Sequence, residues 1–379
     1  MHMKTTTLIS KLKKPDNGRF GKNEFAIIGS TCYNNKRLAF ELIEGLSEQY
    51  HIGYLGSESQ PEDIYADINN DTYSALSHGA ETEILDNSTH TKAIFRKAFS
   101  AHGLRLLMME KDLVFVDGNY YRASQQILLL DQRHYSSLKQ RLHKINNVKL
   151  IVLEEGTKEV PDFLKRHMEN WDRIPICSIT NTEGAVHVIS KLIKENTPEI
   201  WGLIDHHAQD HHYIQSIRHC SQALKVYCKR RLVVKPEKER IFFNSSQFTF
   251  IPETFKNLGA MGKLLSAFRQ NPDKAYWVLD TRYQRFDQEI LQLLHEERDP
   301  ANIATVFAHP KTGMPIPGAC IWEPKAYPLL LTYLAQGIDN LSSILLNSQV
   351  KLLEIPDHNS LNDDLKQKET DDNFLLFNL

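Results

Sequence analysis

The sequence has few cysteines, almost no net charge and no long apolar run. Its five cysteines are scattered and form no Cys-x-x-Cys pair, so a disulfide framework is excluded and we expect reduced thiols: Cys32, Cys177, Cys220, Cys228 and Cys320. A formal net charge of −2 argues against general nucleic-acid binding. No stretch has the apolar length of a membrane span, and the start lacks the apolar core of a signal peptide. These absences predict a cytoplasmic protein with neither nucleic acid nor membrane as its partner.

Length and composition favour two domains. A chain of 379 residues with 41% hydrophobic content can bury at least one sizeable core, and two domains are the natural expectation. We predict a basic leader over 1–23, an α/β domain over 24–197, a second α/β domain over 198–365 and a flexible tail over 366–379. Pro198 supports the junction, because a residue before proline is disfavoured in a helix. Both domains are expected to be doubly wound, mainly parallel and three-layered.

The first domain begins in the order strand, loop, helix, strand. Apolar periodicity predicts a strand over 24–28, a turn over 29–34, an amphipathic helix over 36–50 and a strand over 51–55. This is how a P-loop domain opens, and Gly29 stands where the first glycine of G-x-x-x-x-G-K-[ST] belongs. Asn34 and Asn35 replace the second glycine and the lysine, and Lys36 replaces the hydroxyl residue. The sequence therefore does not support triphosphate hydrolysis, although the amides near Gly29 and Lys36 could still bind a phosphate compound.

The remainder of the first domain alternates strands with helices, as a parallel sheet requires. Strands are predicted over 112–119, 126–130, 149–153 and 175–179, and helices over 135–145, 161–170 and 182–195. Asp117 ends the first of these strands within Asp117-Gly118-Asn119. The simplest interpretation of that tripeptide is a strand-terminating turn, which those residues build on their own.

The second domain centres on the stretch from 257 to 287, which has the features of half a nucleotide site. Gly259 and Gly262 bracket a loop where backbone can approach a ligand, and a helix over 263–268 offers N-terminal amides to an anion. The apolar run 275–279 predicts a strand buried on both faces. Asp280 stands at its carboxyl end, where open α/β sheets bind ligands and a carboxylate can hold Mg²⁺.

Other elements of the second domain follow from apolar patterning. We predict strands over 199–204, 223–229 and 248–252, and helices over 213–224, 287–297 and 325–336.

These motifs resemble the molybdenum-cofactor guanylyltransferases. The resemblance covers roughly residues 199–365. The segments on which it rests are Leu258-Gly259-Ala260-Met261-Gly262, Leu279-Asp280-Thr281-Arg282, Gly313-Met314-Pro315 and Ala319-Cys320-Ile321-Trp322-Glu323-Pro324. The segments His78-Gly79-Ala80 and 112–119 of the first domain look like the small GTP-binding accessory protein of the same pathway. The resemblance implies a nucleotide-diphospho-sugar transferase fold, GTP and Mg²⁺ as cofactors, and a molybdopterin-type ligand. It also implies that Asp280, and in the accessory half Asp117, lie near the metal.

The family's Gly-rich triphosphate loop is missing. The strand over 199–204 runs directly into Asp205-His206-His207-Ala208-Gln209-Asp210-His211-His212, without the Gly-Gly, Arg and Lys that wrap and neutralise the phosphates. Nucleotidyl transfer relies on that positioning and neutralisation. His207 and His211, four residues apart, would share a helix face suited to Zn²⁺ or a similar ion. The alternative is a solvated polar loop.

Three hypotheses follow. The sequence favours a non-catalytic member of this lineage, a pseudoenzyme that acts as a binding or scaffold partner of an active guanylyltransferase paralogue or a molybdoenzyme. The second is an active GTP:molybdopterin guanylyltransferase with Mg²⁺ at Asp280. The third is a metal-binding protein that uses His207 and His211.

Overall fold

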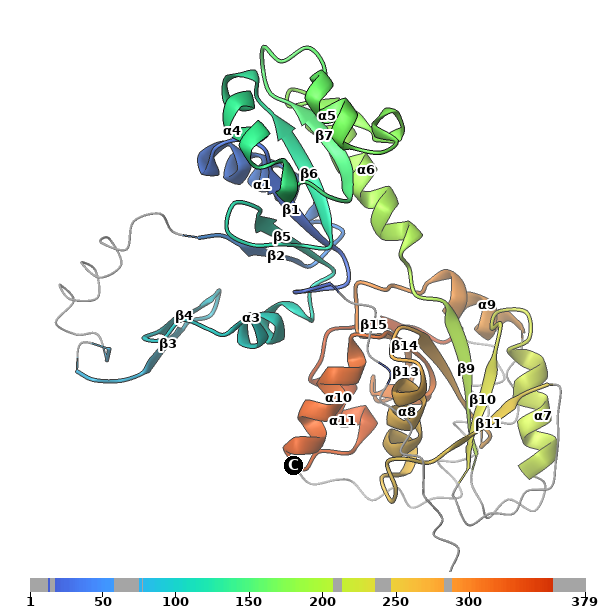
Figure 1. Ribbon diagram of the computed structural model, residues 1–379. Coiled ribbons are helices and arrows are strands. Elements are labelled where there is room, and N and C mark those ends of the chain that lie inside the picture. The colour runs from blue at the N-terminus through green and yellow to red at the C-terminus, as the bar shows by residue number, and fades with distance from the viewer. Residues whose placement is uncertain are drawn as a thin grey trace, which may run out of the picture. The chain divides into compact units, whose positions relative to one another are not determined.

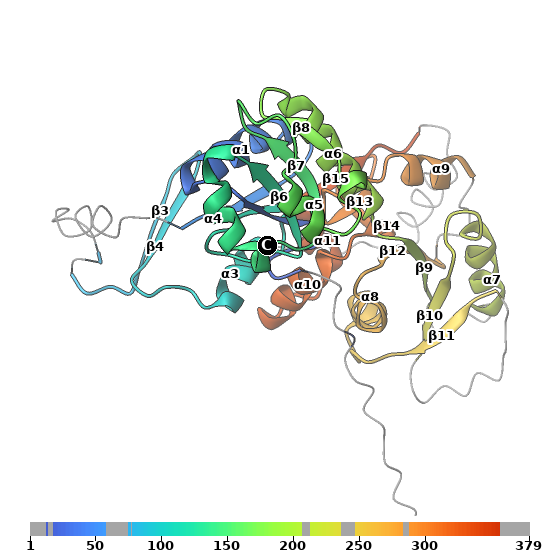
Figure 2. The same cartoon turned by 45° about the horizontal axis from the view of Figure 1, so that its top comes forward.

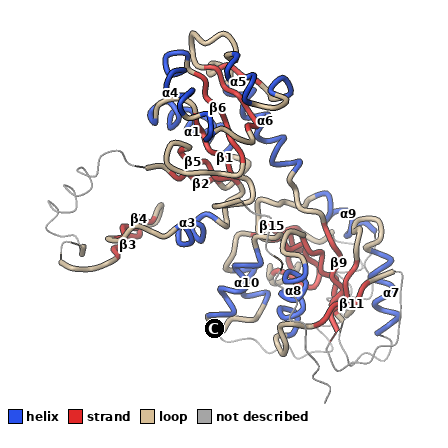
Figure 3. Tube along the Cα trace, in the orientation of Figure 1, coloured by secondary structure: helices blue, strands red, loops and turns tan. Residues whose placement is uncertain are grey.

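The chain forms two compact units, Asn17–Asn196 and Thr197–Leu379, the second together with Met1–Asp16 (Figure 1). The computed structural model describes residues 13, 18–57, 75–76, 78–206, 213–235, 247–282 and 288–356. Each unit is an α/β fold built around its own sheet, and Figure 3 separates the strands from the helices by colour.

A six-stranded, wholly parallel sheet forms the centre of the first unit, in the order β2-β5-β1-β6-β7-β8. Its strands are β1 (Glu24–Ile28), β2 (Ile52–Leu55), β5 (Leu113–Asp117), β6 (Gln125–Leu130), β7 (Val148–Leu153) and β8 (Ile176–Ser178). The helices are α1 (Cys32–Leu46), α3 (Ala101–Met108), α4 (Tyr135–Gln140), α5 (Asp162–His167) and α6 (Thr182–Glu195), with short 3₁₀ turns η1 (Gln132–His134), η2 (Leu142–Lys144) and η3 (Trp171–Arg173). Strands β3 (Thr82–Asp86) and β4 (Thr91–Phe95) form a separate antiparallel pair.

Helices cover both faces of the first sheet. The apolar residues of α1 and α6 pack on one face, where Leu42 and Ile189 are fully buried against strand residues such as Phe115. Leu138 of α4 and Leu164 of α5 pack on the other face. The central strands are apolar on both faces because each face is covered, as expected of a parallel sheet.

The second unit contains a mixed seven-stranded sheet in the order β11-β10-β9-β12-β14-β13-β15. Its strands are β9 (Ile200–Asp205), β10 (Arg231–Lys235), β11 (Thr249–Pro252), β12 (Ala275–Asp280), β13 (Ala304–Ala308), β14 (Pro315–Trp322) and β15 (Val350–Leu353). Its helices are α7 (Tyr213–Ala223), α8 (Gly259–Gln270), α9 (Gln288–Glu296), α10 (Ala326–Ala335) and α11 (Leu341–Leu346). Strand β14 runs antiparallel to both β12 and β13, and the other pairings are parallel.

Two helical layers enclose this second sheet (Figure 2). Ile217 of α7 and Leu294 of α9 belong to one apolar core, together with Trp277 of β12. Leu264 of α8, Leu330 of α10 and Ile344 of α11 belong to the other. The predicted three-layer α/β architecture is thus present in both units.

One predicted strand is wrong. Helix α7 ends at Ala223, residues 224–227 form turns, and the next strand is β10, which begins at Arg231. Cys220, Leu224 and Cys228 are buried at intervals of four, whereas Val226 is 83% exposed. The amide of Cys228 donates to the carbonyl of Leu224 at 2.8 Å, which is a helical bond. The apolar period here is therefore close to that of a helix and not to that of a strand.

Two helices also begin earlier than the sequence predicts. Helix α1 starts at Cys32, capped by the Thr31 side chain, and α8 starts at Gly259.

Among the described residues, no helix is both long and apolar enough to cross a bilayer.

Candidate functional site

The topology of the second unit places its ligand edge between β9 and β12. From β9 the chain crosses through α7 to β10 on one side, whereas β12 lies on the other side of β9. Open α/β sheets bind ligands at the carboxyl ends of the strands where the winding reverses in this way. Asp205 and Asp280 end these two strands and are direct partners in the parallel register. Two carboxylates therefore stand side by side at the expected position.

Lys263 neutralises the first of these carboxylates. Asp205 is 4% exposed, and its Oδ1 accepts a hydrogen bond from the ammonium of Lys263, which also donates to the carbonyl of His206. Helix α8 carries Lys263 in its second turn, on the side that faces the sheet edge. A buried carboxylate is costly unless it is paired, so this ion pair stabilises Asp205 in place.

Arg282 neutralises the second carboxylate. Asp280 is 1% exposed and accepts from the Arg282 guanidinium, with Nε at 2.9 Å and Nη2 at 2.6 Å from Oδ2. Its Oδ1 also accepts from the Arg282 amide at 2.8 Å. The turn after the strand thus folds an arginine back onto the strand-end carboxylate, which forms a forked, charge-assisted contact.

The two glycines of α8 have different environments. Gly259 adopts a left-handed conformation with φ of 52°, and open space surrounds the position of a Cβ. A Cβ on Gly262 would lie 2.3 Å from the carbonyl oxygen of Phe255. Gly262 is therefore required for close packing within the protein, and only Gly259 has open space beside it.

The first unit has its corresponding edge at β1. Gly29 follows β1 with φ of 121°, and a Cβ there would lie 2.4 Å from the carbonyl oxygen of Leu129. Lys36 lies on the exposed side of α1, with its ammonium over the Phe40 ring. Asn35, at the position of the P-loop lysine, is buried at 1% exposure. The structure therefore directs Lys36 away from the sheet, whereas Gly29 allows close packing against β6.

Asp117 ends β5 in a polar cluster. It is 5% exposed, and its Oδ1 accepts from the Asn119 amide at 3.0 Å, the bond that defines an Asx turn. Asn119 also donates to Cys32 Sγ at 3.5 Å. The hydrogen bond between Cys32 and the Tyr120 hydroxyl raises the pKa of Tyr120, and Asp117 adds to this effect. The predicted strand-terminating turn is present, next to the N-terminus of α1.

Two further strand ends of this unit carry paired carboxylates. Asp131, after β6, is 1% exposed and is held by Arg133 through Nη2 at 2.8 Å, and this hydrogen bonding lowers the pKa of Asp131. Glu154, after β7, accepts from Arg37 Nη2 at 2.7 and 2.8 Å. Four strand-end carboxylates of the two units, Asp131, Glu154, Asp205 and Asp280, are therefore held in internal ion pairs.

The remaining predicted metal ligands lie outside the described residues. His207 and His211 both belong to that part of the chain. Within the described residues, no group of three His, Cys, Asp or Glu side chains is arranged to hold a metal ion. Among the described residues, Asp280 has a second carboxylate, that of Asp205, as its direct partner in the strand register.

Sequence reasoning missed the cations at these edges. Asp131-Gln132-Arg133 and Asp280-Thr281-Arg282 share one pattern, in which an aspartate directly after an apolar strand precedes an arginine by two residues. That repetition was a readable signal for the two forked pairs. Lys263 had no local signal, because its partner Asp205 is 58 residues away.

Neither a family model nor a curated protein matches this chain. Among solved structures, it is similar to molybdopterin-guanine dinucleotide biosynthesis protein A from Archaeoglobus fulgidus, at 15% identity over 46% of this chain and 88% of that one, with a TM-score of 0.32. It is similar to a MobB protein homolog from Bacillus stearothermophilus, at 12% identity over 46% of this chain and 99% of that one, with a TM-score of 0.32. It is also similar to 4-diphosphocytidyl-2C-methyl-D-erythritolsynthase from Anaerococcus prevotii, at 11% identity over 45% of this chain and 99% of that one, with a TM-score of 0.33. These distant likenesses concern the fold alone.

Proposed function

We propose that this chain is a non-catalytic member of the molybdenum-cofactor guanylyltransferase lineage, acting as a binding or scaffold partner of an active guanylyltransferase or a molybdoenzyme. The observation that carries the proposal is the ionic pairing at the ligand edge, where Lys263 pairs with Asp205 and Arg282 pairs with Asp280. A nucleotidyl transferase needs such cations for the phosphates and such carboxylates for the metal. Here the two sets neutralise one another.

The sequence supports the same proposal. The segment that begins at Asp205 has neither the glycines nor the arginine and lysine with which the family surrounds the triphosphate. Lys263 and Arg282 are the cations bonded to the two strand-end carboxylates, and freeing either one for a phosphate would leave a buried carboxylate without its partner. Retention of both cores without a phosphate cradle is what we expect of a fold that is used for binding.

A guanylyl-transfer assay tests this function. The purified chain is incubated with molybdopterin, Mg²⁺ and GTP labelled at the α-phosphate, and we expect no transfer above the protein-free rate. In the same reaction with an active guanylyltransferase from the same organism, we expect the chain to change the transfer rate saturably. Transfer by the chain alone that is lost in Asp280→Asn would refute the proposal.

One observation favours the active transferase as a second candidate. The register of β9 and β12 places two buried carboxylates next to each other, and carboxylate oxygens are preferred ligands of Mg²⁺. Asp205 and Asp280 would hold the ion, which would neutralise phosphate charge, while Lys263 and Arg282 would turn toward the phosphates. This candidate predicts GTP binding that requires Mg²⁺ and is lost in Asp280→Ala. Calorimetric titration without detectable GTP binding would eliminate it.

A further inference from the structure

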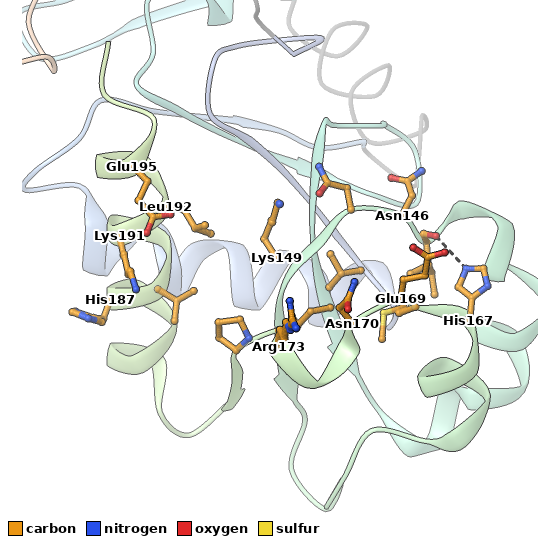
Figure 4. A pocket seen from close by; sticks show the side chains of 17 residues that line it. Asn146, Lys149, His167, Glu169, Asn170, Arg173, His187, Lys191, Leu192 and Glu195 are labelled. Carbon is orange, nitrogen blue, oxygen red and sulfur yellow. Dashed lines mark hydrogen bonds between the residues drawn. The ribbon is translucent and has the colours of Figure 1, made fainter. Parts of the chain in front are cut away.

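A cleft of about 840 Å³ opens at the amino edge of the first unit's sheet (Figure 4). Its walls come from the turn before β7, from the chain between α5 and β8, and from the C-terminal half of α6. All strands of this sheet are parallel, so their starts lie at one edge and their ends at the other. The cleft is therefore separate from Gly29 and Asp117, which lie at the carboxyl edge.

Three irregularities of the backbone meet at this cleft. Lys149 is the extra residue of a β-bulge, since Gln126 and Ile127 of β6 pair with Val148 and Leu150 of β7. Asn147 and Asn170 have left-handed conformations, with φ of 43° and 56°. Bulges redirect side chains, and non-glycine residues at positive φ are uncommon away from turns and ligand sites. Together these features set the direction of the side chains around the cleft.

A buried glutamine fixes one wall. Gln126 is 5% exposed, its Nε2 donates to the Lys144 carbonyl and its Oε1 accepts from the Asn146 amide, both at 2.8 Å. Asn147 Nδ2 donates to the Ser124 carbonyl at 2.6 Å. The turn that leads to Lys149 is therefore held in one conformation by hydrogen bonds within the protein.

The cleft carries three cations without an ionic partner. Among the described residues, no carboxylate lies within 4 Å of the side-chain nitrogens of Lys149, Arg173 or Lys191. They come from three different elements, β7, η3 and α6, yet line one concave surface. This differs from the carboxyl edges, where Arg37, Arg133 and Arg282 are each paired.

The other titratable groups of the lining stand toward its two sides. Figure 4 shows His187 and Glu195 with Lys191 on the α6 side, and His167 and Glu169 on the opposite side, with Lys149 and Arg173 between them. His167 Nε2 lies 3.2 Å from the Ile145 carbonyl oxygen, so this ring is already engaged. The centre of the cleft is thus positive, and the carboxylates of Glu169 and Glu195 lie to either side.

We propose that this cleft binds a small organic phosphate that also carries hydroxyl or amide donors. The phosphate would contact Lys149 and Arg173, which form strong charge-assisted hydrogen bonds with oxyanions, and Lys191 would add a third positive charge. Glu169 and Glu195 would accept from hydroxyl or amide groups of the same ligand. Apolar lining residues, Val148, Ile174 and Leu192, would pack against its carbon atoms.

The size and shape of the cleft support a compact ligand. Small-molecule sites enclose about 300–1,000 Å³, and this cleft falls within that range. A nucleic-acid backbone would instead require a basic stripe along a face. Here the cations line one hollow between flanking carboxylates.

Isothermal titration of the full-length protein with ribose phosphate tests the proposal. Ribose, which is uncharged, and succinate, which is a dicarboxylate, serve as comparison ligands. We expect ribose phosphate to bind and the other two to bind at least tenfold more weakly. The double substitution Lys149→Met with Arg173→Gln should weaken ribose phosphate binding at least tenfold, because two charge-assisted bonds are lost. Lys158→Met and Arg122→Gln, exposed residues of the same unit outside the cleft, serve as matched controls and should bind as the parent does.

Lys191→Met is a second variant on exposed helix surface, and it keeps the test decisive if the double variant unfolds. It should weaken binding severalfold without changing the thermal midpoint of the ligand-free protein. Three results would overturn the proposal: no heat with millimolar ribose phosphate, equal binding of succinate, or unchanged binding in the cleft variants.

Discussion

Replacing Lys263 by Met tests whether the ion pair stabilises the edge of the second unit. Lys263 is 16% exposed and Asp205 5% exposed by side chain, so the pair is largely removed from water. Methionine keeps the length and apolar character of the lysine stem but leaves Asp205 as a buried charge next to Asp280. Breaking a buried pair from one side costs about 3–5 kcal/mol, and because this pair sits at an edge we expect about 3 kcal/mol.

Urea unfolding followed by tryptophan fluorescence measures this loss. Three of the four tryptophans, Trp201, Trp277 and Trp322, are buried in the second unit, so the signal reports mainly on its unfolding. Lys225→Met, at an exposed lysine of the same unit, is the matched control and should change stability by less than about 0.5 kcal/mol.

A second substitution identifies the cause. Adding Asp205→Asn to Lys263→Met removes the unpaired charge, so most of the lost stability should return. A loss for Lys263→Met no larger than that of the control, or no recovery in the double variant, would refute the assignment of a stabilising buried pair. Mg²⁺ should stabilise Lys263→Met more than the parent, because the metal replaces the missing cation.

Three further predictions concern other buried polar groups. Glu24 is fully buried, and its carboxylate accepts hydrogen bonds from the amides of Arg19, Phe20, Gly21 and Ser124 at 2.6–3.3 Å. We therefore expect Glu24→Ala to lower the unfolding free energy by about 3 kcal/mol in urea titrations. An unchanged urea midpoint would contradict this role. The lowered pKa of Asp131 in the folded protein contributes stability at pH values above its ordinary pKa of 3.8, and this contribution is lost as pH falls through the lowered pKa. Asp131→Asn should therefore flatten the dependence of unfolding free energy on pH below about pH 4 and leave that dependence unchanged near neutrality. Burial raises the pKa of Cys220 and of Cys228 to about 12, so Ellman's reagent at pH 8 should react with the partly exposed Cys32 and Cys177 and leave the two buried thiols unmodified until the protein unfolds.

Local patterns predicted most of the elements. Helix α6 has the predicted bounds 182–195, and β1 the predicted bounds 24–28, because apolar periodicity and a capping asparagine are written in adjacent residues. The predicted strand over 223–229 fails for the same local reason, since buried positions four apart suit a helical turn. Helices α1 and α8 each begin four residues before the predicted start, α1 because the Thr31 side chain caps it by accepting from the Asn34 amide, and α8 at Gly259 itself.

The candidate site, too, was only partly predictable from the sequence. The sequence identified Asp280 and Asp117 as strand-end carboxylates, and the structure places both at carboxyl edges. It did not identify the partners of these carboxylates, nor the cleft beside α6. A partner far along the chain, such as Lys263 for Asp205, depends on how a helix packs on the sheet, which no local pattern records.

The sequence by itself determined the α/β class, the position of most strands and helices, and the absence of both phosphate loops, since each is a property of neighbouring residues. Only the tertiary structure decided that Asp205 and Asp280 are neighbours in register, that Lys263 pairs with Asp205, and that Lys149, Arg173 and Lys191 share one cleft. The physical reason is that strand order and helix packing bring distant residues together through burial of the whole core, and charges then pair, or stay unpaired, according to that arrangement.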